Sequence, residues 1–108
     1  MGKLEKIEKY VQKGKEEALI KLVHDRDKAV RIAAISGLGK AGKNDSCNVL
    51  LTLMLDDDPE IRTASATALG VLGNPRARTL LLHHLGVEKD EQVIAAIKSA
   101  VGKLHSSD

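Results

Sequence analysis

Histidine and cysteine are the side chains of this sequence best suited to bind a metal ion or to act as nucleophiles. Cys47 lies near the expected start of a helix, where the helix dipole can lower the pKa of a thiol, but no histidine or second cysteine stands near it. No two histidines show the His-x-x-x-His spacing of a helical zinc site, and none is followed by glutamate. The sequence therefore predicts a protein that is not an enzyme and that has no metal or cofactor site. The four histidines are His24, His83, His84 and His105.

The composition limits the kinds of protein that this chain could be. The 108 residues and 43% hydrophobic content suit one compact domain, and the single aromatic residue, Tyr10, leaves the core to be built from aliphatic side chains. The single cysteine excludes an internal disulfide and favours a reducing, cytoplasmic location. Neither a signal peptide nor an apolar run long enough to cross a membrane is present, so we expect a soluble protein.

The segments that would position these residues repeat along the chain. Residues 25–42 align with residues 56–73 at an offset of 31, which pairs Arg31 with Arg62 and brings aspartates, alanines and glycines into register. A third copy follows at an offset of 32, where Ile94 stands in place of the arginine. Apolar residues spaced three and four apart predict that each unit is a pair of amphipathic helices. The seven expected helices cover residues 3–12, 15–25, 28–40, 46–56, 59–72, 76–87 and 90–104.

Capping residues mark the ends of these helices. Asn74 and Pro75 are expected to be the N-cap and the first position of the helix that ends near residue 87. Asp27 and Asp58 stand where N-caps are expected, and Pro59 occupies a first helical position, where its missing N–H costs nothing. Gly42 and Gly73 close the helices that follow these caps, and we expect both glycines to adopt the left-handed conformation. The turn residues therefore agree with the helical periodicity.

The repeated unit resembles the HEAT-like repeats first named from phycobilisome lyase subunits. The resemblance rests on DRDKAVRIAAISGLGKAG and, more closely, on DDDPEIRTASATALGVLGNPRARTLLLHHL, and it covers nearly everything after Lys15. It implies an all-α, armadillo-like fold: a right-handed α-α superhelix whose second helices line a concave face. We therefore expect one domain over residues 1–108, made of a polar capping helix (1–14) and three repeats (15–43, 44–74 and 75–105).

Two arginines at one repeat position need acidic partners. Stacked repeats would bring Arg31 and Arg62 to roughly 10 Å from each other, and Asp25 and Asp56 each lie six residues before an arginine. The resemblance implies that these four residues form the Asp/Arg ladder that joins adjacent HEAT-like repeats. An anion or phosphate site is the alternative, since a bidentate arginine serves both roles.

A strip of small and mildly apolar residues is expected on the concave side of the second helices. Within residues 28–40, Val30, Ala34 and Gly37 form the buried side, which places Ile32 and Ile35 on the outward side. We expect this strip to bind a partner helix or an extended peptide, with the isoleucine pair as its anchor. Isolated surface isoleucines, or isoleucines packed on the capping helix, are the alternative. The strip consists of Lys28, Ile32, Ile35, Ser36, Thr63, Thr67, Lys98 and Ser99.

A non-enzymatic scaffold or adaptor that binds a protein or peptide is the function that the sequence favours. Binding of a nucleic-acid backbone is one alternative, because lysines recur along the first helix, but interspersed glutamates and the near absence of aromatic side chains disfavour it. An accessory subunit of a lyase-type enzyme is another, which the family resemblance alone suggests. Self-association through the last helix is also open, because we expect Ile94, Ile97 and Leu104 to be exposed there.

Overall fold

The seven expected helices are confirmed. The computed structural model describes residues 2–104, and every regular element within them is an α-helix. Among the described helices, none combines the length and the apolar character that crossing a bilayer requires. The helices begin and end within a few residues of the expected positions. Their bounds are α1 (Lys3–Lys13), α2 (Glu16–Leu22), α3 (Lys28–Ala41), α4 (Asn44–Leu53), α5 (Pro59–Leu72), α6 (Ala77–Leu85) and α7 (Glu91–Lys103).

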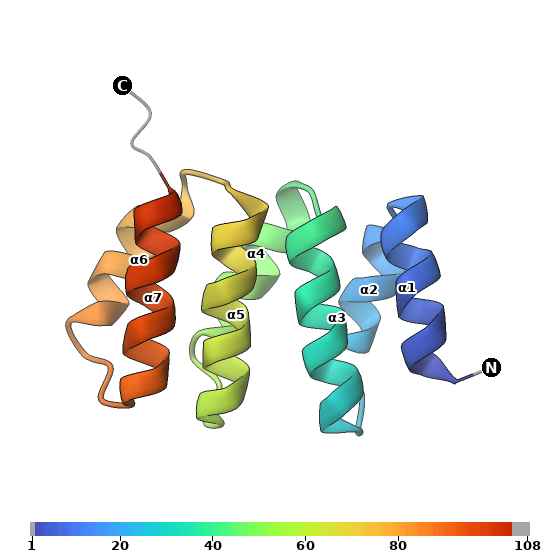
Figure 1. Ribbon diagram of the computed structural model, residues 1–108, viewed down its shortest axis with the longest axis horizontal. Helices are drawn as coiled ribbons and strands as arrows, with labels where there is room; N and C mark the ends of the chain where they lie inside the picture. Colours follow the sequence, from blue (N-terminus) through green and yellow to red (C-terminus); the bar gives the residue numbers. More distant parts are fainter. Residues whose placement is uncertain (1, 105–108) are drawn as a thin grey trace.

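The helices form two layers (Figure 1). The odd-helix layer consists of α1, α3, α5 and α7, which stand side by side, each packed against the next. The even-helix layer lies behind it, where α2 packs on α3, α4 on α5 and α6 on α7. The molecule measures 41 × 31 × 17 Å, as expected for one row of helix pairs. This arrangement is an α-α superhelical solenoid, in which each pair contacts mainly its neighbours.

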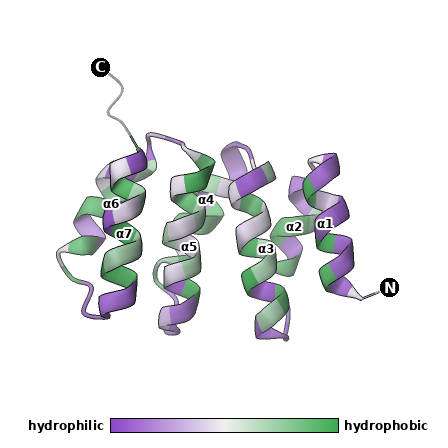
Figure 2. Cartoon of the chain, viewed as in Figure 1, coloured by the Kyte–Doolittle hydropathy of each residue, from purple (hydrophilic) through white to green (hydrophobic). Residues whose placement is uncertain are grey.

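The core lies between the two layers and is aliphatic. Leu19, Leu50 and Leu81, one from each even helix, are completely buried, as are Leu38 and Leu69 of the odd-helix layer. Each such side chain contributes about 1.5–3 kcal/mol when it leaves water. In Figure 2, hydrophilic residues concentrate on α1 and at the helix ends. The buried apolar residues lie mainly where the two layers meet.

Small residues let the odd helices approach one another closely. A Cβ atom added to Gly39 of α3 would lie 3.0 Å from the Cα of Ala68 of α5. One added to Gly70 of α5 would lie 3.0 Å from the Cα of Ala100 of α7. Backbones at this distance leave no room for a side chain, so the repeated glycine sets the spacing of the layer.

The helix caps follow the sequence with two exceptions, of which the first is α6, whose N-cap is Arg76 instead of Asn74. The carboxylates of Asp27, Asp58 and Asp90 each accept a hydrogen bond from a backbone N–H two residues later, as N-caps do. Gly73 is left-handed, with φ 75°. The same expectation for Gly42 was wrong, because its φ is −76° and its backbone is extended. Glycine is needed there for space: a Cβ atom would collide with the hydroxyl of Ser46.

Candidate functional site

The expected binding strip is only partly at the surface. Ser36, Thr67, Lys98 and Ser99 are exposed, and the structure leaves Lys28, Ile32 and Thr63 half-buried. Ile35, however, is completely buried, so its assignment to the outward side was wrong. It lies one helical turn before Gly39, on the side of α3 that packs against α5. An isoleucine pair therefore does not form the anchor.

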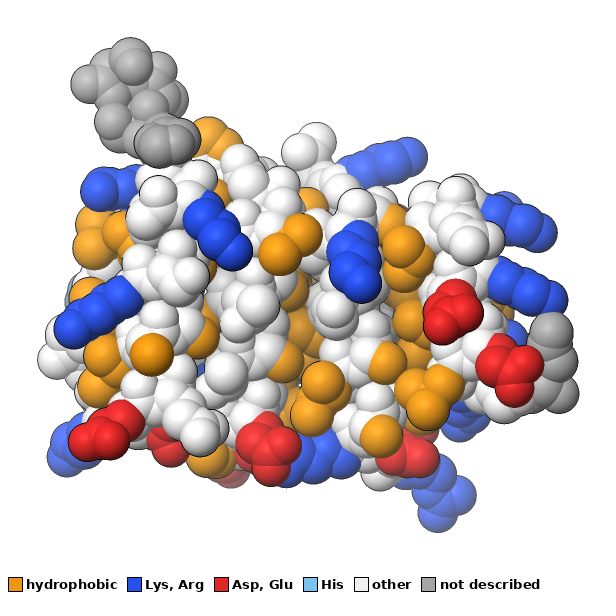
Figure 3. Space-filling view, in the orientation of Figure 1, with side chains coloured by type: hydrophobic (Ala, Val, Ile, Leu, Met, Phe, Trp, Pro, Cys, Tyr) orange, Lys and Arg blue, Asp and Glu red, His pale blue; other side chains and the backbone are white. Residues whose placement is uncertain are grey.

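A shallow groove between α3 and α5 takes the central place on the odd-helix face. Its volume is about 230 Å³, and Val71, which is 51% exposed, borders it on α5. Figure 3 shows apolar side chains scattered over the middle of this face, basic side chains near the upper edge, and both acidic and basic side chains along the lower edge. The lining is therefore mainly apolar with a few polar groups, an arrangement typical of binding sites. The lining residues are Ile32, Ser36, Lys40, Ala64, Thr67, Ala68 and Val71.

Besides the buried Ile35, four residues of the strip do not line this groove. Lys98 and Ser99 stand on α7, and Thr63 lies in the first half of α5. Lys28 has a structural contact instead: its Nζ lies 2.7 Å from Oδ2 of Asp58 and 2.9 Å from Oε1 of Glu60. Hydrogen bonds to Asp58 and Glu60 raise the pKa of Lys28. The ammonium group thus ties the start of α3 to the start of α5.

The four residues expected to form an Asp/Arg ladder contact one another within a repeat, and these contacts do not join adjacent repeats. Arg31 donates from Nη1 to the backbone carbonyl of Asp25 at 2.9 Å, and Arg62 donates to that of Asp56 at 2.7 Å. Within residues 2–104, neither arginine has a hydrogen bond or ion pair to those aspartate carboxylates. Each guanidinium group therefore holds the loop before its own helix through Nη1.

The contact that joins adjacent repeats is an ion pair with Glu88. Arg62 donates from Nε to Oε1 of Glu88 at 2.9 Å and from Nη2 to Oε2 at 3.0 Å. His84 lies 2.8 Å from the same Oε1, and the backbone N–H of Asp90 donates to Oε2 at 3.1 Å. The glutamate side chain is 4% exposed. Chiefly because of the hydrogen bonds from Arg62, the pKa of Glu88 falls to about 2.

Sequence reasoning missed Glu88 although a signal was present. Asp25, Asp56 and Glu88 occupy one position of the repeat, in the loop before each odd helix from α3 to α7. Lys3 of α1 pairs with Asp25 at 2.5 Å, as Arg62 pairs with Glu88. A basic residue of one odd helix thus reaches the acidic residue at this position before the next odd helix at the first and third of these contacts, whereas between α3 and α5 Lys28 pairs with Asp58 and Glu60 instead.

The structure places Cys47 in the core and His84 beside Glu88. Within residues 2–104, no three His, Cys, Asp or Glu side chains are grouped so that they could hold a metal ion. His105 lies outside the described residues. Cys47 is completely buried, and burial raises the pKa of its thiol, opposite to the lowering expected from a helix dipole. The thiol is thus an inert part of the core.

The last helix does not present the apolar surface expected for self-association. Ile97 is completely buried and Leu104 is 2% exposed, because both belong to the core. Exposed apolar side chains gather instead beside α4 and α6, where Leu55 is 76% exposed and Leu80 is 53% exposed. They border a second groove of about 270 Å³. The run of three leucines at 80–82 was the available signal, since only the middle one, Leu81, is buried.

The geometry defines a helical-repeat solenoid whose polar contacts serve mainly to hold its helices together. A family model for HEAT repeats matches residues 16–102, and the chain belongs to that family. The match begins after α1, the helix that the sequence also set apart from the repeats. No curated protein matches the chain.

Proposed function

We propose that this protein is a non-enzymatic scaffold that binds a segment of a protein partner in the groove between α3 and α5. The exposure of Val71 beside Ile32 and the small residues of that groove is the observation that supports the proposal. An aliphatic side chain buried there would contribute about 1.5–3 kcal/mol. Membership of the HEAT repeat family supports a protein-binding role, since helical solenoids offer extended surfaces of this kind. The single buried cysteine supports a cytoplasmic location.

Affinity capture from the native host with two matched variants tests this proposal. Ser36→Gln/Val71→Gln fills and polarises the groove from both walls without changing the charge, and both positions are exposed, so the fold should persist. Leu55→Gln/Leu80→Gln makes a comparable change on the second groove, beside α4 and α6. We expect the first variant to lose a specific partner that the second retains.

Two further measurements locate the captured partner on the surface of the protein. A photo-crosslinking residue at Thr67 should label the captured partner, and titration of the purified partner should show at least about tenfold weaker binding to Ser36→Gln/Val71→Gln. A partner lost only by Leu55→Gln/Leu80→Gln would place binding on the even-helix side and refute the groove. A partner that neither variant loses would refute both surfaces.

A further inference from the structure

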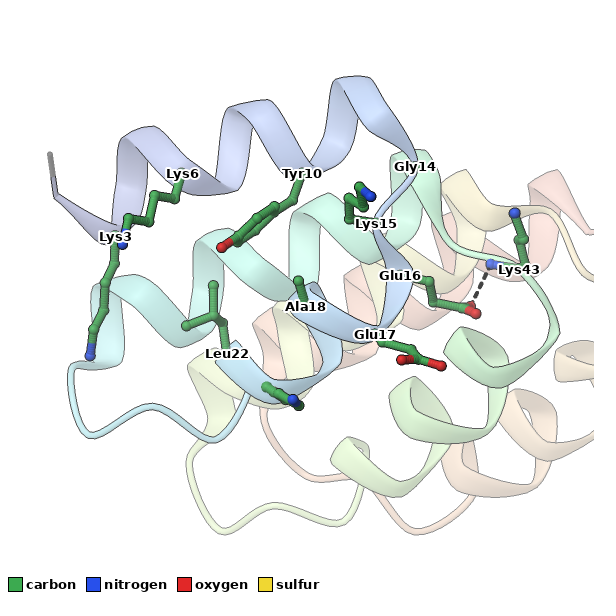
Figure 4. A pocket seen from close by; sticks show the side chains of 11 residues that line it. Lys3, Lys6, Tyr10, Gly14, Lys15, Glu16, Glu17, Ala18, Leu22 and Lys43 are labelled. Carbon is green, nitrogen blue, oxygen red and sulfur yellow. Dashed lines mark hydrogen bonds between the residues drawn. The ribbon is translucent and has the colours of Figure 1, made fainter.

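A cavity lies between α1 and α2, away from the groove between α3 and α5. Its volume is about 740 Å³ (Figure 4). Tyr10, Ala18 and Leu22 line it with half-buried, mainly apolar surface. Exposed lysines surround this surface and outnumber the two glutamates of the lining, Glu16 and Glu17. These lysines are Lys3, Lys6, Lys15, Lys21 and Lys43.

The packing of α1 on α3 shows where this cavity stands in the repeat. A Cβ atom added to Gly37 of α3 would lie 3.0 Å from Cγ2 of Val11. Gly37 has the repeat position of Ala68, which faces Gly39 in the next contact of the layer. Val11 on α1 therefore corresponds to Gly39 on α3. In the contact of α1 with α3 the larger residue is on the first helix, and in the contact of α3 with α5 it is on the second. In this register Ile7 of α1 has the same repeat position as Ile35 of α3, and the two side chains are 5% and 0% exposed.

The register identifies α1 as an odd helix, and within residues 2–104 no even helix is paired with it as α2 is with α3. Tyr10 corresponds to Leu38 and Lys6 to Ala34, and both of those α3 residues are completely buried where α2 and α3 form a pair. On α1, by contrast, Tyr10 is half-buried, Lys6 is exposed and both line the cavity. The cavity therefore occupies the place where an even helix before α1 would pack.

The charges around the cavity define what could occupy this place. Lys3 is paired with Asp25, and Glu16 is engaged by the hydroxyl of Ser46 at 2.5 Å and by backbone N–H groups. The described residues provide no recorded ion pair for Lys6, Lys15 or Lys21. Their ammonium groups remain available around an apolar floor. Acidic side chains flanking an apolar stripe would complement this arrangement.

We propose that the cavity between α1 and α2 binds an acidic amphipathic helix of a protein partner. The helix takes the place where an even helix paired with α1 would pack: its apolar stripe covers Tyr10, Ala18 and Leu22, and its carboxylates meet Lys6, Lys15 and Lys21. The 11 residues of α1 extend about 16 Å, enough to accompany about three turns. This surface is separate from the groove between α3 and α5, so either proposal can fail alone.

A synthetic peptide of about 15 residues, with leucines at helical spacing and glutamates on both flanks, is the probe. We expect its titration into the labelled protein to shift the amide resonances of Tyr10 and Ala18. Binding should weaken about tenfold or more in Lys6→Glu/Lys21→Glu, because two attractive contacts become repulsive. Lys98→Glu/Lys103→Glu makes the same change of charge on α7, at exposed positions outside both proposed surfaces, and should alter affinity less than about twofold.

Several outcomes would overturn the proposal. They are the absence of saturable binding, equal binding of a peptide with lysines in place of the glutamates, and resonance shifts at α3 and α5 instead of α1 and α2. Equal weakening by both variants, or equal binding of an unstructured polyglutamate, would reduce the interaction to general charge attraction. Lys15→Glu provides a second variant in the lining, which should also weaken binding if the cavity is the site.

Discussion

Replacement of Glu88 by glutamine should separate the contact between repeats from the rest of the fold. The substitution keeps the shape of the side chain and removes the charge that receives two hydrogen bonds from Arg62. Because the glutamate is 4% exposed, water cannot readily replace the lost partner. The variant should therefore be less stable at neutral pH, with its helices otherwise unchanged.

The pKa of Glu88 gives the size of this effect. A fall from the ordinary value of 4.5 to about 2 corresponds to about 3 kcal/mol, at about 1.4 kcal/mol per pKa unit. Solvent access to the edge of the ion pair reduces the expected loss to about 2 kcal/mol. The pKa is lower in the folded state, so this stability is present above about pH 5 and disappears as the pH falls through about 2.

Urea unfolding followed by circular dichroism measures this contribution. The quantity to compare is the difference in unfolding free energy between wild type and Glu88→Gln, because other carboxylates affect both proteins alike. We expect about 2 kcal/mol at pH 7 and less than about 0.5 kcal/mol at pH 2. Glu17→Gln, at an exposed position, is the control and should change stability by less than about 0.5 kcal/mol at either pH. A difference for Glu88→Gln that stays constant between pH 7 and pH 2 would refute the role of its charge.

Three further predictions concern packing. Gly70→Ala should destabilise the protein by about 1–3 kcal/mol in urea unfolding, because its Cβ meets the backbone of Ala100. Gly102→Ala, at the same repeat position but in open space, should stabilise it by about 0.5–1 kcal/mol; equal effects would contradict the packing argument. Ile35→Asp should cost about 3–5 kcal/mol and abolish the circular dichroism of the folded chain, and a folded variant would argue against burial. Cys47 should react with Ellman's reagent at least about tenfold more slowly in the native protein than in urea, and equal rates would show that the thiol is accessible.

The helices and their pairing were predictable because their signals are local. Asp27 and Asp58 cap helices through N–H groups two residues away, and apolar residues recur at helical spacing. The position of Ile35 was not predictable in this way. A helix inside the layer is covered by two odd neighbours as well as an even helix, so its apolar side is wider than one stripe. The periodicity of α3 alone assigned Ile35 to the outward side of the helix. In the structure, Ser36 is exposed on that side and Ile35 is buried.

The contacts between repeats were less predictable than the repeats themselves. The partner of Arg62 is 26 residues away, and its identity depends on how the loop after α6 places the side chain of Glu88. Alignment of the loops would have revealed the acidic position but not its arginine. The cavity beside α1 was harder still to predict, because it depends on how the described helices are arranged: no even helix within residues 2–104 packs on α1 at that place. Sequence alone predicted a polar first helix, without predicting that Tyr10 and its surrounding lysines would form a concave surface.

The two ends of the odd-helix layer present different surfaces to a further helix. Lys98 of α7 holds the repeat position of Ile35 and Ala66, both completely buried against the next odd helix. A helix packed there in the same manner would have to desolvate the ammonium group of Lys98 without a carboxylate partner from the repeat, which disfavours extension at α7. At α1, the lysines stand around an apolar floor and stay hydrated at its edge, so a helix can cover the floor while its carboxylates pair with them. Addition of an acidic helix is therefore favoured beside α1 and α2, whereas a helix with the apolar contacts of the repeat is disfavoured on the open side of α7.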